Sequence, residues 1–501
     1  MDFYDAVTDL YTEVSFKCPR INKDTEAKFK SFIRDIVFNN RRCLVYGDYD
    51  PDGLFSTLIV KESFHLMGYT NFDICKYHNR THALDPEAKT NVLAGDYDYM
   101  FISDTASSNL KDIQDIVAEG IRVIIIDHHE TVHDAEDFPD ECVFINSTVE
   151  NRTREDKLVV SAAALVFIMM YSYLKDCRID GRKISAYALA SMYADSIDMS
   201  SKFARGLYTL ATHLPRELIP IEISAFLNEH KKFARRFIEF DMVPKLNSAF
   251  RSEKFHTINE TLLGTARANS LECYDMVEYL ADLHNDMASL VTRVSNIIYA
   301  EELEHFIIGN LDTVNGEIDV IENKLYNLTG LVANKLADKY KKSAIVICTN
   351  DSGVKGSFRD LVGRAYLPTF RSICTCGGHV SAFGFSLGIF EVQDFIRKIK
   401  VIDDNFGINE RENEPIILSI PNPDISLLQD MAKYNEFAGS EYPLTLLRVP
   451  RTSAITEMKN RYGGYNYKWN GRLVVSRKPV AIGEDLLIRP TIALSLRLYT
   501  V

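Results

Sequence analysis

The fold of the first part of the chain is decided by one stretch, Cys43-Leu44-Val45-Tyr46-Gly47-Asp48-Tyr49-Asp50-Pro51-Asp52-Gly53. Its first four residues are apolar enough for a short buried strand, and polar residues follow at once. Two later runs repeat this pattern, Tyr99-Met100-Phe101-Ile102 and Val123-Ile124-Ile125-Ile126. Helix-like segments lie between the runs. The alternation predicts an α/β fold with a parallel sheet that is covered on both faces.

Acidic residues and histidines follow these predicted strands. They are Asp48, Asp50 and Asp52 after the first run, Asp104 after the second, and Asp127-His128-His129 after the third. A further candidate, Asp195, lies on a helical segment rich in Ala and Ser. The carboxyl ends of parallel strands share one edge of a sheet, so these side chains should converge there. If the backbone from 48 to 52 is extended, its three aspartates face the same side.

Carboxylates brought together repel one another unless cations lie among them. Oxygen ligands with one imidazole suit Mn²⁺ or Mg²⁺. Two such ions, roughly 3.5–4 Å apart, could activate water and stabilise charge on a phosphoryl group.

Simpler interpretations compete with a metal site. Taken alone, Asp104 is typical of a turn at a strand end, and Asp195 of a charge on a helix surface. The run Asp48 to Gly53 also resembles a calcium-binding loop. That loop needs a bidentate glutamate six residues after its glycine, and position 59 is Ile. The calcium interpretation is therefore weak.

The order of these segments resembles the DHH phosphoesterase superfamily, which is named after the triplet found here as Asp127-His128-His129. Within it, the stretch from Gly47 to Gly53 is similar to the RecJ branch of single-stranded-DNA-specific exonucleases. The resemblance covers residues 40–210 and 326–390. It implies a parallel-sheet DHH domain and a smaller α/β DHH-associated domain, joined by helices.

The resemblance also implies a metal centre with two divalent cations, Mn²⁺ preferred or Mg²⁺. The implied ligands are Asp50 and Asp104, with Asp48, for one ion, and Asp52, Asp104, His128 and Asp195 for the other. His129 would face the substrate phosphate, and Asp127 would orient the imidazoles. Tyr46 stands where many relatives have a histidine, and Asp198 is a rival to Asp195.

A second series of residues indicates a phosphate site. It consists of Gly330, Ser357, Arg359, Gly377, Gly378 and His379. Glycines let a backbone approach a phosphate, and the polar side chains supply hydrogen-bond donors. The resemblance implies that Arg359 and His379 grip the nucleotide. Two departures are visible: Phe383 replaces an alanine of the RecJ pattern and would reshape the pocket, and Arg80 lacks the glycines that normally follow it.

We expect four domains. They are a DHH catalytic domain (1–205), a helical connector (206–325), a DHH-associated substrate-binding domain (326–405) and a β-rich C-terminal domain (406–501), for which an oligonucleotide-binding barrel is one form. The dipeptide Asn470-Gly471 between two strand-like runs predicts a hairpin.

The C-terminal segment is basic on an acidic chain. From Thr445 to Val501 there are ten Lys or Arg and three Asp or Glu, against a net charge of -13 for the whole chain. Tyr462, Tyr465, Tyr467 and Trp469 lie among these charges. Cations and aromatic faces suit the binding of single strands. The same aromatics are equally typical of the core of a small β domain, and the sequence leaves both interpretations open.

Composition narrows the functional class. With 501 residues, 46% of them apolar, the chain can bury several cores. Its nine cysteines lack metal-binding or disulfide spacing. The apolar run 158–174 is short for a membrane span, and no secretory signal opens the sequence. We therefore expect a cytosolic protein without membrane attachment.

The function that these features favour is a RecJ-like exonuclease acting on single-stranded nucleic acid, DNA favoured, by analogy from the 5′ end, with a role in DNA repair and recombination. The alternative is a DHH phosphodiesterase for short oligoribonucleotides or cyclic dinucleotides. An inactive DHH scaffold is disfavoured because competent ligands fill every expected metal position except Tyr46.

Overall fold

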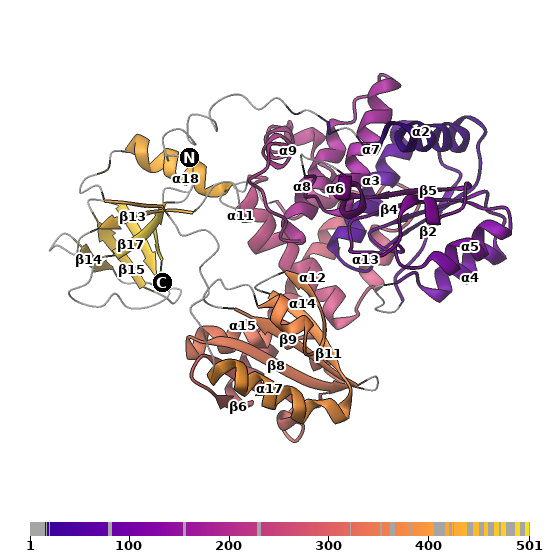
Figure 1. Ribbon diagram of the computed structural model, residues 1–501. Coiled ribbons are helices and arrows are strands. Elements are labelled where there is room, and N and C mark those ends of the chain that lie inside the picture. Colours follow the sequence, from indigo (N-terminus) through magenta and orange to yellow (C-terminus); the bar gives the residue numbers. More distant parts are fainter. Residues whose placement is uncertain are drawn as a thin grey trace. The chain divides into compact units, whose positions relative to one another are not determined.

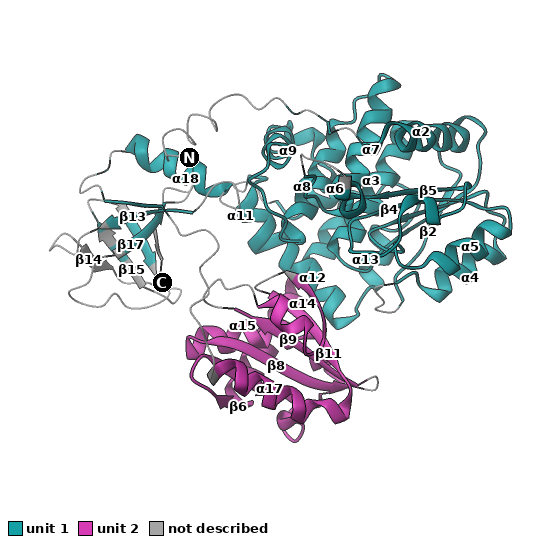
Figure 2. Cartoon of the chain, in the orientation of Figure 1, with its two compact units in different colours: residues 1–279, 415–500 teal, residues 280–414, 501 magenta. Residues whose placement is uncertain are grey.

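The computed structural model describes residues 16, 18–19, 21–78, 83–153, 157–227, 232–320, 322–350, 353–360, 366–379, 382–404, 416–419, 423, 425–437, 444–449, 455–458, 465–469, 472–476, 486–490 and 496–499. The chain divides into two compact units (Figure 2). Unit 1 contains residues 1–279 and 415–500, and unit 2 contains residues 280–414 and 501.

The first sheet of unit 1 has five parallel strands in the order β2-β1-β3-β4-β5 (Figure 1). They are β1 (Cys43–Gly47), β2 (Phe72–Ile74), β3 (Tyr99–Ser103), β4 (Arg122–Asp127) and β5 (Cys142–Asn146). Every residue of β1, β3 and β5 is buried. Burial on both faces explains why the strands are continuous apolar runs rather than alternating ones. The predicted parallel sheet is confirmed.

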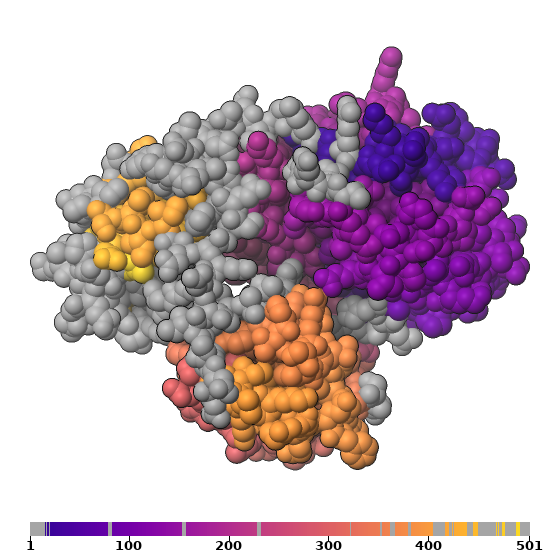
Figure 3. All heavy atoms as spheres, viewed as in Figure 1, coloured from indigo at the N-terminus to yellow at the C-terminus, as the bar shows by residue number. Residues whose placement is uncertain are grey.

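Helices cover both faces of this sheet (Figure 1). On one face α4 (Pro86–Ala94) and α5 (Leu110–Ala118) pack over Met100, Ile102 and Ile125. On the other lie α2 (Lys23–Phe38), α3 (Pro51–Leu66) and α7 (Ala162–Asp176), and α8 (Ser185–Ala194) packs against α3 and α7. Figure 3 shows the outer surface of the molecule in the same view, with all heavy atoms drawn as spheres. The short α6 (Ser147–Thr153) follows β5.

The apolar run around α7 is a core helix, since residues 162–170 are all buried. Within the described ranges, no helix combines the length and the apolar character needed to cross a bilayer. After α8 the chain continues through further helices. They are α9 (Lys202–Thr212), α10 (Ile221–Ser224), α11 (Arg235–Phe237), α12 (Val243–Ser252), α13 (His256–Thr261) and α14 (Ser270–Ile297).

The helical connector that we predicted to reach residue 325 ends earlier. Tyr299–Glu302 forms β6 and Phe306–Asn310 forms β7, and both belong to the sheet of unit 2. The helical prediction was wrong here because the apolar residues at 306–308 pair with β8 (Ser343–Asn350) as a buried strand. Unit 2 accordingly begins at 280 and not at 326.

Unit 2 is a six-stranded mixed sheet in the order β10-β11-β9-β8-β7-β6. Its remaining strands are β9 (Gly353–Arg359), β10 (Thr375–His379) and β11 (Ala382–Leu387). The helix α15 (Thr329–Tyr340) packs on one face. On the other face α16 (Leu367–Arg371) and α17 (Val392–Asp404) cover a cluster of phenylalanines.

The C-terminal part of unit 1 has a seven-stranded sheet in the order β12-β13-β17-β18-β16-β15-β14, with one helix, α18 (Ile425–Glu436). The strands are β12 (Ile416–Leu418), β13 (Thr445–Val449), β14 (Ile455–Met458), β15 (Tyr465–Trp469), β16 (Arg472–Ser476), β17 (Leu486–Pro490) and β18 (Leu496–Tyr499). Antiparallel pairing of Trp469 with Arg472 confirms the predicted hairpin. Tyr467 and Trp469 are buried, so these two aromatics are core residues, while the side chains of Tyr462 and Tyr465 lie outside the described residues.

Candidate metal centre

The turn between β1 and α3 places the first aspartates. Asp50 is the N-cap of α3, and its carboxylate accepts hydrogen bonds from the backbone N–H groups of Asp52 (2.8 Å) and Gly53 (3.0 Å). A Cβ at Gly53 would lie 2.1 Å from the carbonyl oxygen of Asp48, so only glycine lets the helix start so close to the loop. The extended backbone that we assumed from 48 to 52 is therefore wrong. A helix begins at Pro51, because an Asp cap followed by Pro favours a helix start.

Asp52 is buried and held by the N-terminus of α7. Its carboxylate accepts hydrogen bonds from the backbone N–H groups of Ala162 and Ala163, both at 2.8 Å. The hydroxyl of Ser191, on α8, donates a third hydrogen bond. A carboxylate at a helix N-terminus is favoured by the helix dipole. These contacts fix the side chain relative to three helices.

Asp104 follows β3 and is also buried, with a positive φ of 63°. Asp tolerates this left-handed conformation better than most residues. Within the described part of the chain, neither of its carboxylate oxygens accepts a hydrogen bond. One of them lies 3.4 Å from Nε2 of His128. A buried carboxylate without hydrogen-bond donors needs another partner.

The end of β4 is organised by Asp127. One of its oxygens accepts hydrogen bonds from the backbone N–H groups of His128 (2.7 Å) and His129 (3.2 Å) and lies 2.8 Å from Nδ1 of His129. We predicted that Asp127 orients both imidazoles. The described contacts show it holding the ring of His129 and only the backbone of His128.

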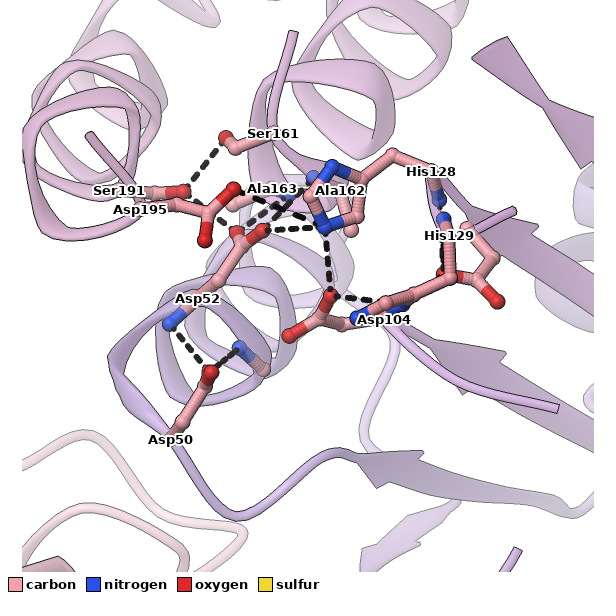
Figure 4. A network of polar contacts seen from close by, with 12 residues as sticks. Asp50, Asp52, Asp104, His128, His129, Ser161, Ala162, Ala163, Ser191 and Asp195 are labelled. Carbon is pink, nitrogen blue, oxygen red and sulfur yellow. Dashed lines mark hydrogen bonds and ion pairs between the residues drawn. The ribbon is translucent and has the colours of Figure 1, made fainter. Parts of the chain in front are cut away.

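Nε2 of His128 is the point on which three of the other ligand candidates converge (Figure 4). It lies 3.7 Å from Asp52, 3.4 Å from Asp104 and 3.7 Å from Asp195, the C-cap of α8. Ligand atoms of Asp52, His128 and Asp195 lie within 4.8 Å of one another, as do those of Asp48, Asp50 and Asp104. Ligand atoms of Asp104, His128 and His129 form a third such group. The predicted ligands thus lie close together, and their assignment to particular ions stays a prediction. Asp198 belongs to none of these groups and accepts a hydrogen bond from the backbone of Ser200.

Electrostatics show that this cluster is unfavourable by itself. Burial, and then the neighbouring carboxylates, raise the pKa of Asp104 and Asp195 well above the usual range. Burial also raises the pKa of Asp52 and lowers that of His128. Burial by itself would raise the pKa of Asp127 and lower that of His129. The hydrogen bond and ion pair between the two side chains outweigh this effect, so the pKa of Asp127 is lowered and that of His129 is raised to about 9. Buried oxygen donors with like charges fit divalent cations.

Comparison with known proteins agrees with this geometry. Residues 42–195 match the model of the DHH family, N-terminal domain. This part of the chain is therefore similar to a DHH domain. The chain is similar to the single-stranded-DNA-specific exonucleases RecJ of Bacillus subtilis (21% identity, 74% of this chain, 47% of the relative) and Escherichia coli (22% identity, 74% of this chain, 67% of the relative). The chain thus spans about half the length of the B. subtilis relative.

A crystal structure of RecJ in complex with Mn²⁺ from Thermus thermophilus has the same fold. The TM-score is 0.72 at 15% identity, over 97% of this chain and 73% of the other. The predicted fold class, a RecJ-like α/β fold, is therefore confirmed.

In unit 2, the two predicted phosphate residues of β9 lie on one sheet face. Alternation along β9 puts Ser357 and Arg359 on the side of α15, where the Ser357 hydroxyl is 2.8 Å from that of Thr329. Gly330 leaves room for the Arg359 guanidinium, which would lie 2.5 Å from a Cβ there. Gly377 is exposed, with open space where a Cβ would be. Gly378 has a φ of 134°, a conformation that favours glycine. The His379 side chain and Arg80 lie outside the described residues.

Phe383 does not reshape this site, contrary to our expectation. It points to the opposite face of the sheet, where its ring stacks 4.8 Å from that of Phe358. Strand alternation forces this outcome, because Phe383 pairs with Phe358 and Gly384 pairs with Ser357.

Sequence reasoning missed the residues that hold the DHH site in place. Ser191 donates to Asp52, and Ser161 contacts Ser191 at 2.6 Å. Asn146 donates to the carbonyl of His129 at 2.9 Å. Thr148 donates to the carbonyl of His128 at 2.7 Å. The only signal in the sequence was a polar residue inside an apolar helix, as with Ser191. Tyr46, the departure noted above, is a core residue whose hydroxyl contacts the carbonyl of Ala83 at 3.4 Å.

Proposed function

We propose that this chain is a metal-dependent exonuclease that hydrolyses phosphodiester bonds of single-stranded DNA, from the 5′ end. The observation that carries the proposal is the convergence of Asp52, Asp104 and Asp195 on His128, where the buried oxygens of Asp104 accept no hydrogen bond from any described residue. The similarity to exonucleases that act on single-stranded DNA supports the choice of substrate.

Different side chains of the site would have different roles. Asp52, His128 and Asp195 would hold one divalent cation, and Asp48, Asp50 and Asp104 a second, with Asp104 near both. Two bound cations would lower the pKa of a water molecule and offset charge on the phosphoryl group. His129 is half exposed and is held by Asp127, a position from which its ring can donate to a phosphate oxygen.

Unit 2 would position the substrate. The guanidinium of Arg359 beside Gly330, with Ser357 and the bare backbone at Gly377, forms a face that a nucleotide phosphate can approach. His379 would add a further donor. These roles are proposals that rest on the fold and on the donors present.

The decisive experiment is digestion by the purified protein with Mn²⁺ or Mg²⁺. Substrates are single strands of DNA and RNA labelled at the 5′ or 3′ end, together with dinucleotides and cyclic dinucleotides. We expect mononucleotides released from the 5′ end of DNA, and none from the Asp104→Asn variant. Preferred hydrolysis of cyclic dinucleotides or short RNA would favour the small-substrate alternative, and binding of DNA without any hydrolysis would contradict the enzyme.

Strand length gives an independent test. If long DNA is held along a basic surface, its cleavage should fall more steeply with salt than that of a dinucleotide, because more phosphates release counterions. Equal salt slopes for both substrates would argue against an extended binding surface.

A further inference from the structure

The carboxylate of Asp52 is largely engaged by the protein itself. Within the described residues, its Oδ1 accepts hydrogen bonds from the backbone of Ala163 (2.8 Å) and from Ser191, and Oδ2 accepts one from the backbone of Ala162 (2.8 Å). An ionised carboxylate has about four acceptor positions, two on each oxygen. One position therefore remains, on Oδ2, the oxygen that lies 3.7 Å from Nε2 of His128 (Figure 4).

The hydrogen bonds behind Asp52 have a fixed direction. Ser191 has one hydroxyl proton, and the ionised carboxylate can only accept it. The 2.6 Å contact between the hydroxyls of Ser161 and Ser191 must then use the proton of Ser161. Ser161 in turn accepts from the backbone N–H of Ala164 at 3.3 Å. Both serines are fully buried, so water does not compete for these bonds. We call this chain, from Ala164 through Ser161 and Ser191 to Asp52, the serine relay.

We propose that the serine relay determines which divalent cation the DHH site prefers, because it leaves Asp52 a single oxygen for metal binding. This inference rests on the proposed metal centre. Mg²⁺ and Mn²⁺ suit octahedral sites in which a carboxylate contributes one oxygen. Ca²⁺ takes six to eight oxygens and readily uses both oxygens of one carboxylate. An Asp52 that offers only Oδ2 disfavours Ca²⁺.

The test is calorimetric titration of the metal-free protein with Mn²⁺ and, separately, with Ca²⁺. Ser191→Ala frees a position on Oδ1 and loosens Asp52. We expect Mn²⁺ affinity to fall about tenfold or more, as is usual when a partner of a metal ligand is removed. Affinity for Ca²⁺ should fall less or rise, so the preference for Mn²⁺ narrows. Ser161→Ala should act in the same direction with a smaller effect, and Ser191→Thr, which keeps the hydroxyl, should restore the wild-type ratio.

Ser185→Ala is the matched control. Ser185 is buried on the same helix, α8, but its hydroxyl donates to the carbonyl of Arg182 at 2.7 Å and does not contact Asp52. We expect its Mn²⁺ to Ca²⁺ affinity ratio to equal that of the wild type. Equal losses for both ions in Ser191→Ala would overturn the inference, because a merely structural role lowers both together. Wild-type protein that binds neither ion would instead overturn the proposed metal centre.

Discussion

Replacing Asp104 by Asn should stabilise the metal-free protein while weakening the stabilisation that metal provides. In the structure Asp104 is buried, accepts no hydrogen bond from the described residues, and has a ligand oxygen within 4.8 Å of those of Asp48 and Asp50. Two like charges at that distance repel by about 3 kcal/mol at an effective dielectric constant of roughly 20. Asn has nearly the same shape, carries no charge, can donate to the neighbouring carboxylates, and tolerates the φ of 63°.

Proton uptake by Asp104 in the wild type limits the stability that Asp104→Asn can gain. Burial and neighbouring carboxylates raise the pKa of Asp104 well above its usual value, so the contribution of Asp104 to the stability of the metal-free wild type is greatest at low pH and is lost as the pH rises through that raised pKa. At pH 7.5 we expect Asp104→Asn to increase the free energy of unfolding by about 1–3 kcal/mol. The melting temperature would rise by about 2–4 °C per kcal/mol for a domain of roughly 200 residues.

The assay is thermal unfolding of both proteins in EDTA and in Mn²⁺, followed by circular dichroism. Wild type should gain stability on adding Mn²⁺, and Asp104→Asn should gain less, because only the set of Asp52, His128 and Asp195 stays complete. Asp104→Ala serves as a second variant, which should gain less in EDTA because Ala is strained at positive φ. A variant Asp104→Asn that melts below the wild type in EDTA would refute the repulsion on which the argument depends.

Three further predictions follow from the same contacts. Stabilisation by Mn²⁺ should grow as the pH rises from the ordinary carboxylate range through the raised pKa values of Asp104 and Asp195, since metal and protons compete for these side chains; a shift in melting temperature that is independent of pH would contradict this. Asp127→Asn should weaken the hold on His129 and reduce activity about 10–100-fold while Mn²⁺ still raises the melting temperature; loss of both responses would mean that Asp127 supports the ligands as well. Trp469→Ala should destabilise the C-terminal sheet by about 3–5 kcal/mol, because the ring is buried; a variant with normal unfolding but weak binding of single strands would instead support a stacking role.

The local conformation at Asp50 shows where sequence patterns mislead. Aspartates at alternate positions suggest a strand, yet the Asp50 carboxylate caps α3 and directs the chain into a helix. The cap and the following Pro51 were visible in the sequence. These two signals favour a helix, whereas the alternation favours a strand. The helix forms because Gly53 can approach the backbone of Asp48 closely, and this contact between a loop and a helix is not visible in a local sequence pattern.

The aromatic residues of the C-terminal sheet show a similar limit, because the sequence does not reveal which side of their strand is buried. Alternation placed Tyr467 and Trp469 on one side of a strand, and both are buried. The sequence could not say whether that side met the core or the solvent, because a one-residue change of register exchanges the two. The register in which β15 pairs with β14 and β16 places this side of the strand, with Tyr467 and Trp469, in the core.

By itself, the sequence determined the parallel sheet and the edge at which its acidic residues gather, since apolar runs of strand length followed by polar residues allow few other arrangements. Tertiary structure alone decided how Asp52 is held, because the N–H groups of Ala162 and Ala163 and the hydroxyl of Ser191 come from positions more than a hundred residues away. Patterns along a chain report which residues are buried; hydrogen bonds between distant helices depend on distances that exist only after the helices have packed.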